Sequence, residues 1–164
     1  MNSKLAGFII LVSVALVFAA GCLDNNDVQT TASAIPVTAT WIEPQVIDNT
    51  VVIPVKAIDE NINTHFKVRT TAGEIAVMAY KLGDNIVVRS NVCPPCGSIG
   101  FSLDNDILVC DSCRTTFDAV TGQGIQGACV DYPKESIPFT VSDGNIVMEL
   151  NDIVTAHMNT VQRG

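Results

Sequence analysis

Short stretches that alternate between hydrophobic and polar residues recur from residue 45 onward and predict β-strands. Asp, Asn and Gly residues separate many of these stretches and are typical of tight turns. The predicted strands are residues 45–47, 51–55, 66–70, 74–81, 86–89, 101–103, 107–109, 139–141 and 146–150. Because strands joined by short turns usually pair as hairpins, the pattern predicts antiparallel sheets.

Only the end of the chain has the spacing of an amphipathic helix. The residues that recur at this spacing are Ile153, Val154, His157, Met158 and Val161. Asn151 or Asp152 is expected to cap the helix. No internal repeat and no second domain is evident. Residues 41–164 are therefore predicted to form one all-β domain, a small antiparallel β-barrel or sandwich that begins at Trp41 and ends in a short helix.

The pattern is different at the N-terminus, where Lys4 precedes a long apolar run over residues 5–20. A basic residue followed by such a run is typical of a secretory signal. Small residues directly before Cys22 resemble the lipobox of prokaryotic lipoproteins, although Ala19 stands where a branched aliphatic residue is commoner. We therefore predict that residues 1–21 are a signal peptide and that Cys22 carries the lipid.

An uncleaved anchor helix and a plain secreted protein are the alternatives. The apolar run is short for a bilayer span, which needs about 20 residues. Residues 22–40 are polar, small and turn-rich, and they predict a flexible tether between the anchor and the domain. Each alternative places the domain outside the cytoplasm, and the lipoprotein interpretation places it on the extracytoplasmic face of the cell membrane.

The chain is acidic, with 17 Asp and Glu against 9 Lys and Arg and a net charge of −8. This charge argues against nucleic acid as a partner and against charge-driven binding to anionic lipid. No Ser–His–Asp nucleophile motif and no phosphate-binding glycine loop occurs, and the glycines at 122 and 124 are interpreted as a turn. A binding or electron-transfer role is therefore favoured over catalysis.

Four cysteines in the second half of the chain are the main chemical signal. Cys93 and Cys96 form one C-x2-C pair, Cys110 and Cys113 form another, and thirteen residues separate the pairs. Two such pairs can present four thiolates in a tetrahedral arrangement, which suits zinc, a single iron or an iron–sulfur cluster. Disulfides are common outside the cell, but two C-x2-C pairs fit a disulfide framework poorly. Thiol–disulfide exchange stays open as a further alternative.

Cys129 is left over once the four paired cysteines and Cys22 are assigned. It is a fifth or alternate ligand, a resolving thiol, or a small buried hydrophobic residue, and the sequence does not separate these possibilities. His65 lies in a predicted strand and is expected to be packed or at the surface rather than a ligand. His157, in the predicted helix, is expected to have no special role.

The residues after the second cysteine pair resemble the closing half of a Rieske domain over about residues 88–150. The similar segments are Phe117-Asp118, Thr121-Gly122, Gly127, residues 137–141 and Asp143-Gly144. A Rieske centre takes two histidines on one iron, whereas this chain has Cys96 and Cys113 at the second position of each pair. The resemblance therefore implies a Rieske-like fold without a standard Rieske centre.

A fuller resemblance, over about residues 50–150, is to the FtrD-like membrane iron–sulfur family. The similar motifs are His65-Phe66, Cys93 to Gly97, Gly100-Phe101, Cys110 to Cys113, Phe117, and Gly127-Ala128-Cys129 with Pro133. The resemblance implies an extracytoplasmic, membrane-attached iron–sulfur protein associated with ferrous-iron transport systems. We predict a one-electron carrier with a centre on the four paired cysteines, most readily [2Fe–2S], and a membrane redox or metal-transport partner. A structural zinc site that staples an interaction module, and a thiol–disulfide exchange protein, are the alternatives.

Overall fold

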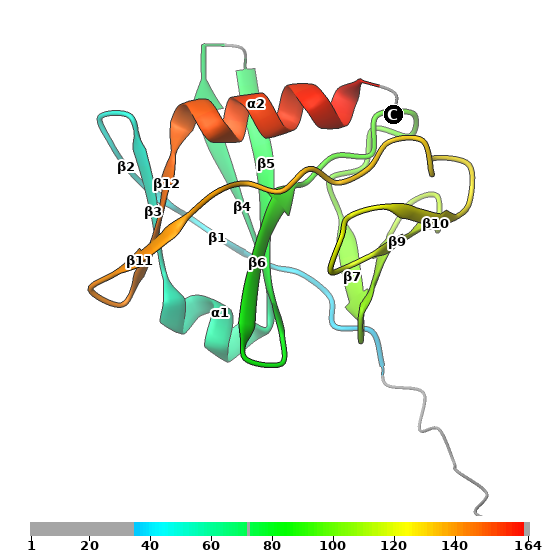
Figure 1. The fold of residues 1–164 in the computed structure, drawn as a ribbon, viewed down its shortest axis with the longest axis horizontal. Helices are drawn as coiled ribbons and strands as arrows, with labels where there is room; N and C mark the ends of the chain where they lie inside the picture. Colours follow the sequence, from blue (N-terminus) through cyan, green and yellow to red (C-terminus); the bar gives the residue numbers. More distant parts are fainter. Residues whose placement is uncertain (1–34, 72, 163–164) are drawn as a thin grey trace, which may run out of the picture. The chain divides into compact units, whose positions relative to one another are not determined.

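The computed structural model describes residues 35–71 and 73–162, and within them the chain forms three four-stranded sheets and two helices (Figure 1). The first sheet, in spatial order, contains β1 (Thr40–Ile42), β4 (Asn63–Thr70), β5 (Gly73–Leu82) and β6 (Asn85–Ser90). The second contains β11 (Thr140–Ser142), β12 (Asn145–Glu149), β3 (Thr50–Pro54) and β2 (Gln45–Ile47). The third contains β10 (Gly124–Gln126), β9 (Thr116–Asp118), β8 (Ile107–Cys110) and β7 (Phe101–Asp104). The helices are α1 (Val55–Asn61) and α2 (Leu150–Val161).

The predicted hairpins are present, and the predicted mostly-β fold with a short C-terminal helix is confirmed. β2–β3, β4–β5, β5–β6, β7–β8 and β11–β12 all pair in antiparallel fashion. At three of the turns a short polar residue has a left-handed backbone, with φ of 53° at Asp48, 54° at Asn105 and 51° at Asp143. Asn and Asp tolerate this conformation better than other non-glycine residues, which is why these turns were visible in the sequence.

Strand β5 separates two hydrophobic cores because both of its faces are buried. Val77 and Ala79 pack in the first core, while Met78 and Tyr80 pack in the second. Successive side chains of a strand point to opposite faces, so the alternation along β5 assigns one residue to each core in turn. The sequence of a strand that is buried on both faces is almost continuously apolar. Burial of both faces therefore cannot be recognised from an alternation of hydrophobic and polar residues.

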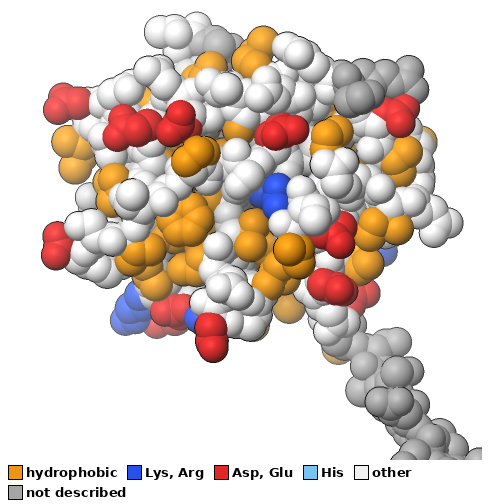
Figure 2. All heavy atoms as spheres, viewed as in Figure 1, with side chains coloured by type: hydrophobic (Ala, Val, Ile, Leu, Met, Phe, Trp, Pro, Cys, Tyr) orange, Lys and Arg blue, Asp and Glu red, His pale blue; other side chains and the backbone are white. Residues whose placement is uncertain are grey.

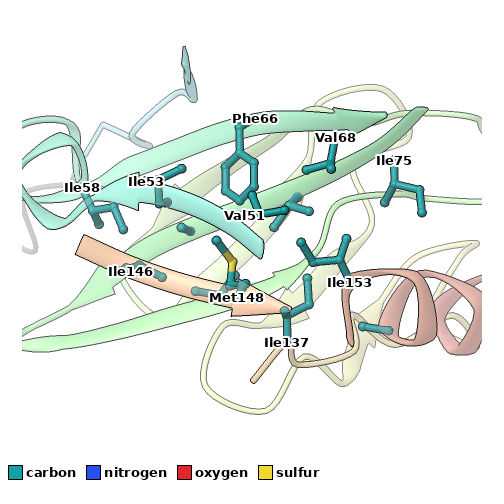
Figure 3. Packing of buried hydrophobic residues seen from close by; sticks show 14 residues of the cluster. Val51, Ile53, Ile58, Phe66, Val68, Ile75, Ile137, Ile146, Met148 and Ile153 are labelled. Carbon is teal, nitrogen blue, oxygen red and sulfur yellow. The ribbon is translucent and has the colours of Figure 1, made fainter. Parts of the chain in front are cut away.

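The first core lies between the sheets that contain β4 and β3, and α2 contributes to it. Figure 3 shows Phe66 of β4 directed toward Val51 of β3 and toward Met148 of β12. Ile153 of α2 is fully buried at the edge of the same cluster. This core supports the first and second sheets and contains none of the paired cysteines.

The second core contains Cys93, Cys110 and Cys129 together with aromatic side chains. Phe101 and Phe117 are fully buried and meet edge to face, with ring centres 6.0 Å apart. The third sheet and one face of β5 supply the remaining apolar side chains of this cluster. The cysteine loops are thus built on a hydrophobic base of their own, and β5 connects that base to the rest of the domain.

Helix α1 is missing from the sequence prediction, which extended a strand to Val55. The strand ends at Pro54, whose φ of −67° and missing N–H suit the position just before a helix. Ile58 is the buried residue of α1, and Lys56 and Glu60 form an exposed i,i+4 ion pair at 3.5 Å. A seven-residue helix with a single buried residue gives too little periodicity to be recognised.

Helix α2 was predicted, but its cap and its buried face differ from the prediction. The helix begins at Leu150, so neither Asn151 nor Asp152 is the capping residue, and Glu149 precedes it without a side-chain cap. The buried residues are Ile153, Ala156 and Thr160, and Met158 is exposed. Packing of α2 on β5, β6 and β12 decides which of its residues are buried. The buried face therefore includes a small residue, Ala156, and a polar residue, Thr160, which a search for hydrophobic spacing omits.

Residues before Trp41 already belong to the folded domain, and one strand pair is parallel rather than antiparallel. Val37, in the predicted tether, exchanges backbone hydrogen bonds of 2.7 and 2.9 Å with Leu103. Buried Asn63 donates to the carbonyl oxygen of Val37 at 3.0 Å and to that of Phe101 at 2.9 Å. β1 then runs parallel to β4, a long-range pairing that no local pattern indicates. The predicted signal peptide at 1–21 and the lipidation site at Cys22 lie outside the described residues.

On the face drawn in Figure 2, acidic side chains are spread over the surface, with hydrophobic and uncharged groups between them. This distribution is the one expected from the scattered Asp and Glu positions in the sequence. Within the described ranges, no helix is long and apolar enough to span a membrane.

Candidate metal centre

The first cysteine pair lies on the loop between β6 and β7, and backbone hydrogen bonds close the base of this loop. Cys93 N–H donates to the carbonyl oxygen of Ser98 at 2.8 Å, and Gly97 N–H donates to that of Cys93 at 2.8 Å. Cys96 N–H donates to the same Cys93 oxygen at 3.2 Å. Gly97 has a φ of 69°, a conformation that glycine adopts without a Cβ clash. The loop is therefore a tight turn that presents both sulfurs together.

The second pair, at the end of β8, repeats this backbone geometry. Cys110 N–H donates to the carbonyl oxygen of Thr115 at 2.9 Å, five residues on as in the first loop. Arg114 N–H donates to the carbonyl oxygen of Cys110 at 3.0 Å, and Arg114 has a φ of 59°. Asp111 N–H joins the loops by donating to the Gly100 oxygen at 3.0 Å. The two loops are thus equivalent turns that face each other.

The four sulfurs of the predicted site converge. Sγ atoms of Cys93, Cys96, Cys110 and Cys113 all lie within 4.8 Å of one another. The Cys93–Cys113 and Cys96–Cys110 pairs are each 3.8 Å apart. Among the described residues this is the group of Cys, His and acidic side chains arranged to hold a metal ion. We refer to these four residues as the cysteine cage.

The cage has a buried side and a solvent side. Cys93 and Cys110 are fully buried, whereas Cys113 is half-buried and Cys96 is exposed. The second cysteine of each pair therefore occupies the solvent side, at the positions where the Rieske resemblance would have required histidine. Electrons can reach a centre in the cage through this side with little protein in between.

Burial and hydrogen bonding affect the thiols of the cage differently. Burial raises the pKa of Cys93 and of Cys110, although backbone N–H groups of Cys113 and Ser112 oppose the shift at Cys110. For Cys113, burial also opposes ionisation, but hydrogen bonds from the hydroxyl and backbone N–H of Thr115 outweigh it and lower the pKa to about 6. Cys113 therefore ionises more readily than the buried Cys93 and Cys110, and a metal must displace protons from that buried pair.

Cys129, whose role the sequence left open, lies beside the cage. Its Sγ is 3.7 Å from that of Cys113, and its backbone N–H donates to Thr115 Oγ1 at 3.3 Å. Cys129 is buried and is outside the four-sulfur group. At this position Cys129 could hydrogen-bond to Cys113 as a thiol, or it could form a disulfide with Cys113 when the two are oxidised.

The segment that carries Cys129 packs closely on the second cysteine loop because glycines allow it. Gly127 has a φ of 121°, and a Cβ there would lie 2.5 Å from Thr115 Oγ1. A Cβ on Gly122 would lie 2.2 Å from the carbonyl oxygen of Lys134. Gly122, which the sequence suggested was part of a simple turn, and Gly127 therefore allow residues 127–134 to pack against the site.

Sequence reasoning missed two polar residues at the site, Thr115 and Lys134. Thr115 is fully buried, and its hydroxyl lies 3.2 Å from Cys113 Sγ. Lys134 is 1% exposed. One signal was present, because Lys134 is the only Lys or Arg between Arg114 and Arg163 and follows Cys129 by five residues.

His65 is buried behind the first cysteine loop and lies outside the cysteine cage. Its Nδ1 is 3.0 Å from Asn91 Nδ2, and its ring meets the Trp41 ring edge to face at 5.2 Å. Burial lowers the pKa of His65 to about 3, against a smaller opposing effect from the backbone of Ile99. The folded protein therefore holds His65 neutral, and the expected packing role fits this environment.

This environment predicts a pH dependence of stability. Below pH 6.5 the unfolded chain binds a proton at His65 that the folded chain does not bind, so the free energy of unfolding falls as pH falls toward 3. The slope is about 1.4 kcal/mol per pH unit, or about 2 kcal/mol between pH 6.5 and 5. In chemical denaturation, His65→Gln is expected to lose this part of the slope. Burial also lowers the pKa of the half-buried His157, so His157→Gln is expected to lose a smaller part of the slope than His65→Gln. Equal slopes in all three proteins would contradict the assignment.

The donor set of the cage fits an iron–sulfur or iron centre. All four donors are thiols, and backbone N–H groups of Ser112, Cys113 and Thr115 point at the sulfurs. A single tetrahedral metal with bonds of about 2.3 Å places its sulfurs roughly 3.8 Å apart, as in the two close pairs. Sulfurs on the two irons of a [2Fe–2S] cluster lie farther apart, because the iron–iron distance adds to their separation. The separations of 3.8 Å therefore match a single metal ion directly, and the set of four thiol donors also suits an iron–sulfur cluster.

Residues 58–159 match the family described as membrane iron-sulfur containing protein FtrD-like. Because the match covers more than half of the chain, the protein belongs to this family. No curated protein matches the sequence significantly. The match confirms the family resemblance that the cysteine, glycine and aromatic motifs indicated.

The fold is similar to that of a chain in the complex of reduced oxygenase and oxidized ferredoxin in carbazole 1,9a-dioxygenase. The TM-score is 0.52 at 17% identity, and the match covers 63% of this chain and 95% of that chain. Two ferredoxins match more weakly. One, of the carbazole 1,9a-dioxygenase from Nocardioides aromaticivorans IC177, has a TM-score of 0.45 at 19% identity, covering 66% and 98%. The other, from Sphingomonas yanoikuyae B1, has a TM-score of 0.41 at 24% identity, covering 45% and 74%.

Proposed function

We propose that this protein is a membrane-anchored, extracytoplasmic iron–sulfur protein that passes single electrons. The observation that carries the proposal is the convergence of four sulfurs within 4.8 Å on two equivalent loops. Membership of a membrane iron–sulfur family and the likeness in fold to a chain of a ferredoxin complex support it.

Cys93, Cys96, Cys110 and Cys113 are the residues that would hold the centre, and [2Fe–2S] is the cluster type that we propose. When bound, an iron–sulfur cluster supplies reversible one-electron chemistry at iron. The buried Cys93 and Cys110 fix the inner side and exclude water there, while Cys96 provides the side open to a partner. The N–H groups that face Cys110 and Cys113 stabilise negative charge on sulfur.

The proposed partners are at the membrane. A lipid on Cys22 would hold the domain at the extracytoplasmic face, with the following residues as a tether. A reduced membrane redox protein would give one electron to the centre, and an oxidised component of a metal-ion transport or respiratory system would accept it. The exposed position of Cys96 supports exchange with a docked protein, because electron transfer requires a short separation.

A redox titration tests the electron-carrier proposal. Protein prepared without air is expected to have a visible absorption that bleaches on addition of one electron per chain and returns on reoxidation. A protein that binds iron and sulfide but takes up no electron would contradict the function while leaving the site intact. Fractionation of cells that express the full chain or Cys22→Ala tests the anchor, because only the full chain is expected in the membrane fraction.

A structural zinc site is the second candidate, because the close sulfur separations also suit a single tetrahedral ion. In that case the zinc ion would hold the two cysteine loops together, and the surrounding surface would bind a partner without redox chemistry. Zinc-loaded protein would be colourless, would show no electron uptake, and would lose structure on addition of a chelator. The same titration therefore separates the two candidates.

A further inference from the structure

Lys134 is a buried amine against the first cysteine loop. Its side chain is enclosed by protein, and its Nζ donates to the carbonyl oxygens of Val92 at 2.8 Å and Tyr132 at 2.7 Å. Nζ also lies 4.3 Å from the centre of the Phe117 ring and 5.5 Å from that of Phe101. Val92 directly precedes Cys93 in the chain, so the amine is adjacent to the inner side of the cage.

The charge of Lys134 is compensated by the cysteines. Burial lowers the pKa of Lys134 to about 8, and the thiolates that oppose this effect belong to Cys93, Cys110, Cys129 and Cys96. The interaction is mutual: burial raises the pKa of Cys93, while the charge on Lys134 lowers it. A buried cation is strongly destabilising when nothing balances it. Cysteines that are ionised, as they are when the cage binds a metal, supply that balance.

The ammonium is held in a fixed place. Arg89 Nη1 donates to the carbonyl oxygen of Lys134 at 2.7 Å, and Lys134 N–H donates to the Gly122 oxygen at 2.8 Å. Two backbone acceptors and two aromatic rings then fix the end of the side chain. A charge that does not reorient acts at full strength on a neighbouring centre, because no reorganisation is needed when the charge of the centre changes.

Hydrogen bonding alone does not account for a lysine at this position. The two carbonyl oxygens need donors, and a neutral amide could supply them without the cost of burying a charge. The position instead combines a full positive charge, low exposure and proximity to four thiols. This combination is useful when the site next to it carries negative charge.

We propose that Lys134 is the counter-charge of the cysteine cage and that it raises the midpoint potential of the bound centre. This inference rests on the proposed function. A centre with four thiolate ligands is negative, and it becomes more negative when it accepts an electron. A fixed positive charge therefore stabilises the reduced state more than the oxidised state. Lys134 is in this sense a positioning residue for electron transfer, because it acts through the cage without being a ligand.

Redox titration of Lys134→Gln and Lys134→Met tests the inference. Gln keeps donors for the carbonyl oxygens and Met keeps only the apolar stem, so both remove the charge. Both variants are expected to have a lower midpoint potential than the wild type. Lys56→Met is the control, because Lys56 is a lysine with an 80% exposed side chain, and its potential is expected to be unchanged. A potential that stays at the wild-type value in folded Lys134→Gln and Lys134→Met would overturn the inference.

Two further readouts separate this inference from its alternatives. If Lys134→Gln folds and Lys134→Met does not, the hydrogen bonds to Val92 and Tyr132 are needed for folding, and the potential of Lys134→Gln decides the inference. If neither variant folds, the lysine has a structural role and the inference is wrong. If the wild type takes up no electron, the proposed function fails. Competition with a chelator then tests separately whether the positive charge of Lys134 stabilises a metal bound in the cysteine cage. A zinc-loaded cage is also negative, so Lys134→Gln is expected to release zinc at a lower chelator concentration than the wild type and Lys56→Met. Equal release would contradict the counter-charge role.

Discussion

Serine in place of Cys93 or Cys110 is expected to remove the bound centre almost completely. Both thiols are fully buried on the inner side of the cage, where a hydroxyl is a poor replacement for a soft thiolate ligand. Loss of residues that only orient ligands costs roughly 10- to 100-fold in metal affinity, so loss of a ligand is expected to cost more than about 100-fold. Metal content and visible absorption of protein purified without air measure the effect.

Cys129→Ser is the matched control for these variants. Cys129 is equally buried and has its sulfur 3.7 Å from that of Cys113, but it lies outside the cysteine cage. The variant is expected to keep its metal at close to the wild-type amount. A loss as large as that of Cys93→Ser would make Cys129 a ligand and would contradict the four-cysteine assignment.

Phe117→Ala is expected to destabilise the domain by about 3–5 kcal/mol, as is typical of removing a buried aromatic side chain. The ring is fully buried against Phe101 and lies 4.3 Å from the ammonium of Lys134. The change removes packing beneath the cage and the cation–π contact together. Chemical denaturation gives the free energy of unfolding, and the metal content of the folded fraction shows whether the cage is affected.

Phe66→Ala separates the two cores in the same experiment. Phe66 is also fully buried, but it belongs to the core between the first and second sheets. A similar loss of stability is expected, with the metal retained by whatever protein is folded. If Phe117→Ala costs less than about 1 kcal/mol, or if both variants lose metal equally, the second core is not the base of the site.

The hairpins and the cysteine pairs were predictable because their signals are local. The residue types in a turn such as Asp143-Gly144 predict its left-handed backbone conformation. A C-x2-C spacing likewise brings two sulfurs together within one turn. The convergence of the two pairs could be predicted because a single β-hairpin, β7–β8, separates them. The fold class followed from these hairpins together with the family resemblance.

Long-range packing was not predictable in the same way. The pairing of Val37 with Leu103 and the parallel pairing of β1 with β4 join segments that have no shared local pattern. Helix α1 is too short to show a period, and its single buried residue is set by the neighbouring sheets. The close packing of the Lys134 backbone on residue 122, and of residue 127 on Thr115, depends on glycine at both positions, and this becomes visible only when the segments are placed together.

Iron and acid-labile sulfide analysis of the wild-type protein, purified without air, tests the central proposal most directly. The four-cysteine centre that we propose predicts iron and sulfide in equal amounts, about two of each per chain for a [2Fe–2S] cluster. The Cys93→Ser protein, prepared in parallel, is expected to contain neither. One zinc per chain without sulfide, at full occupancy and with no iron, would contradict the proposal.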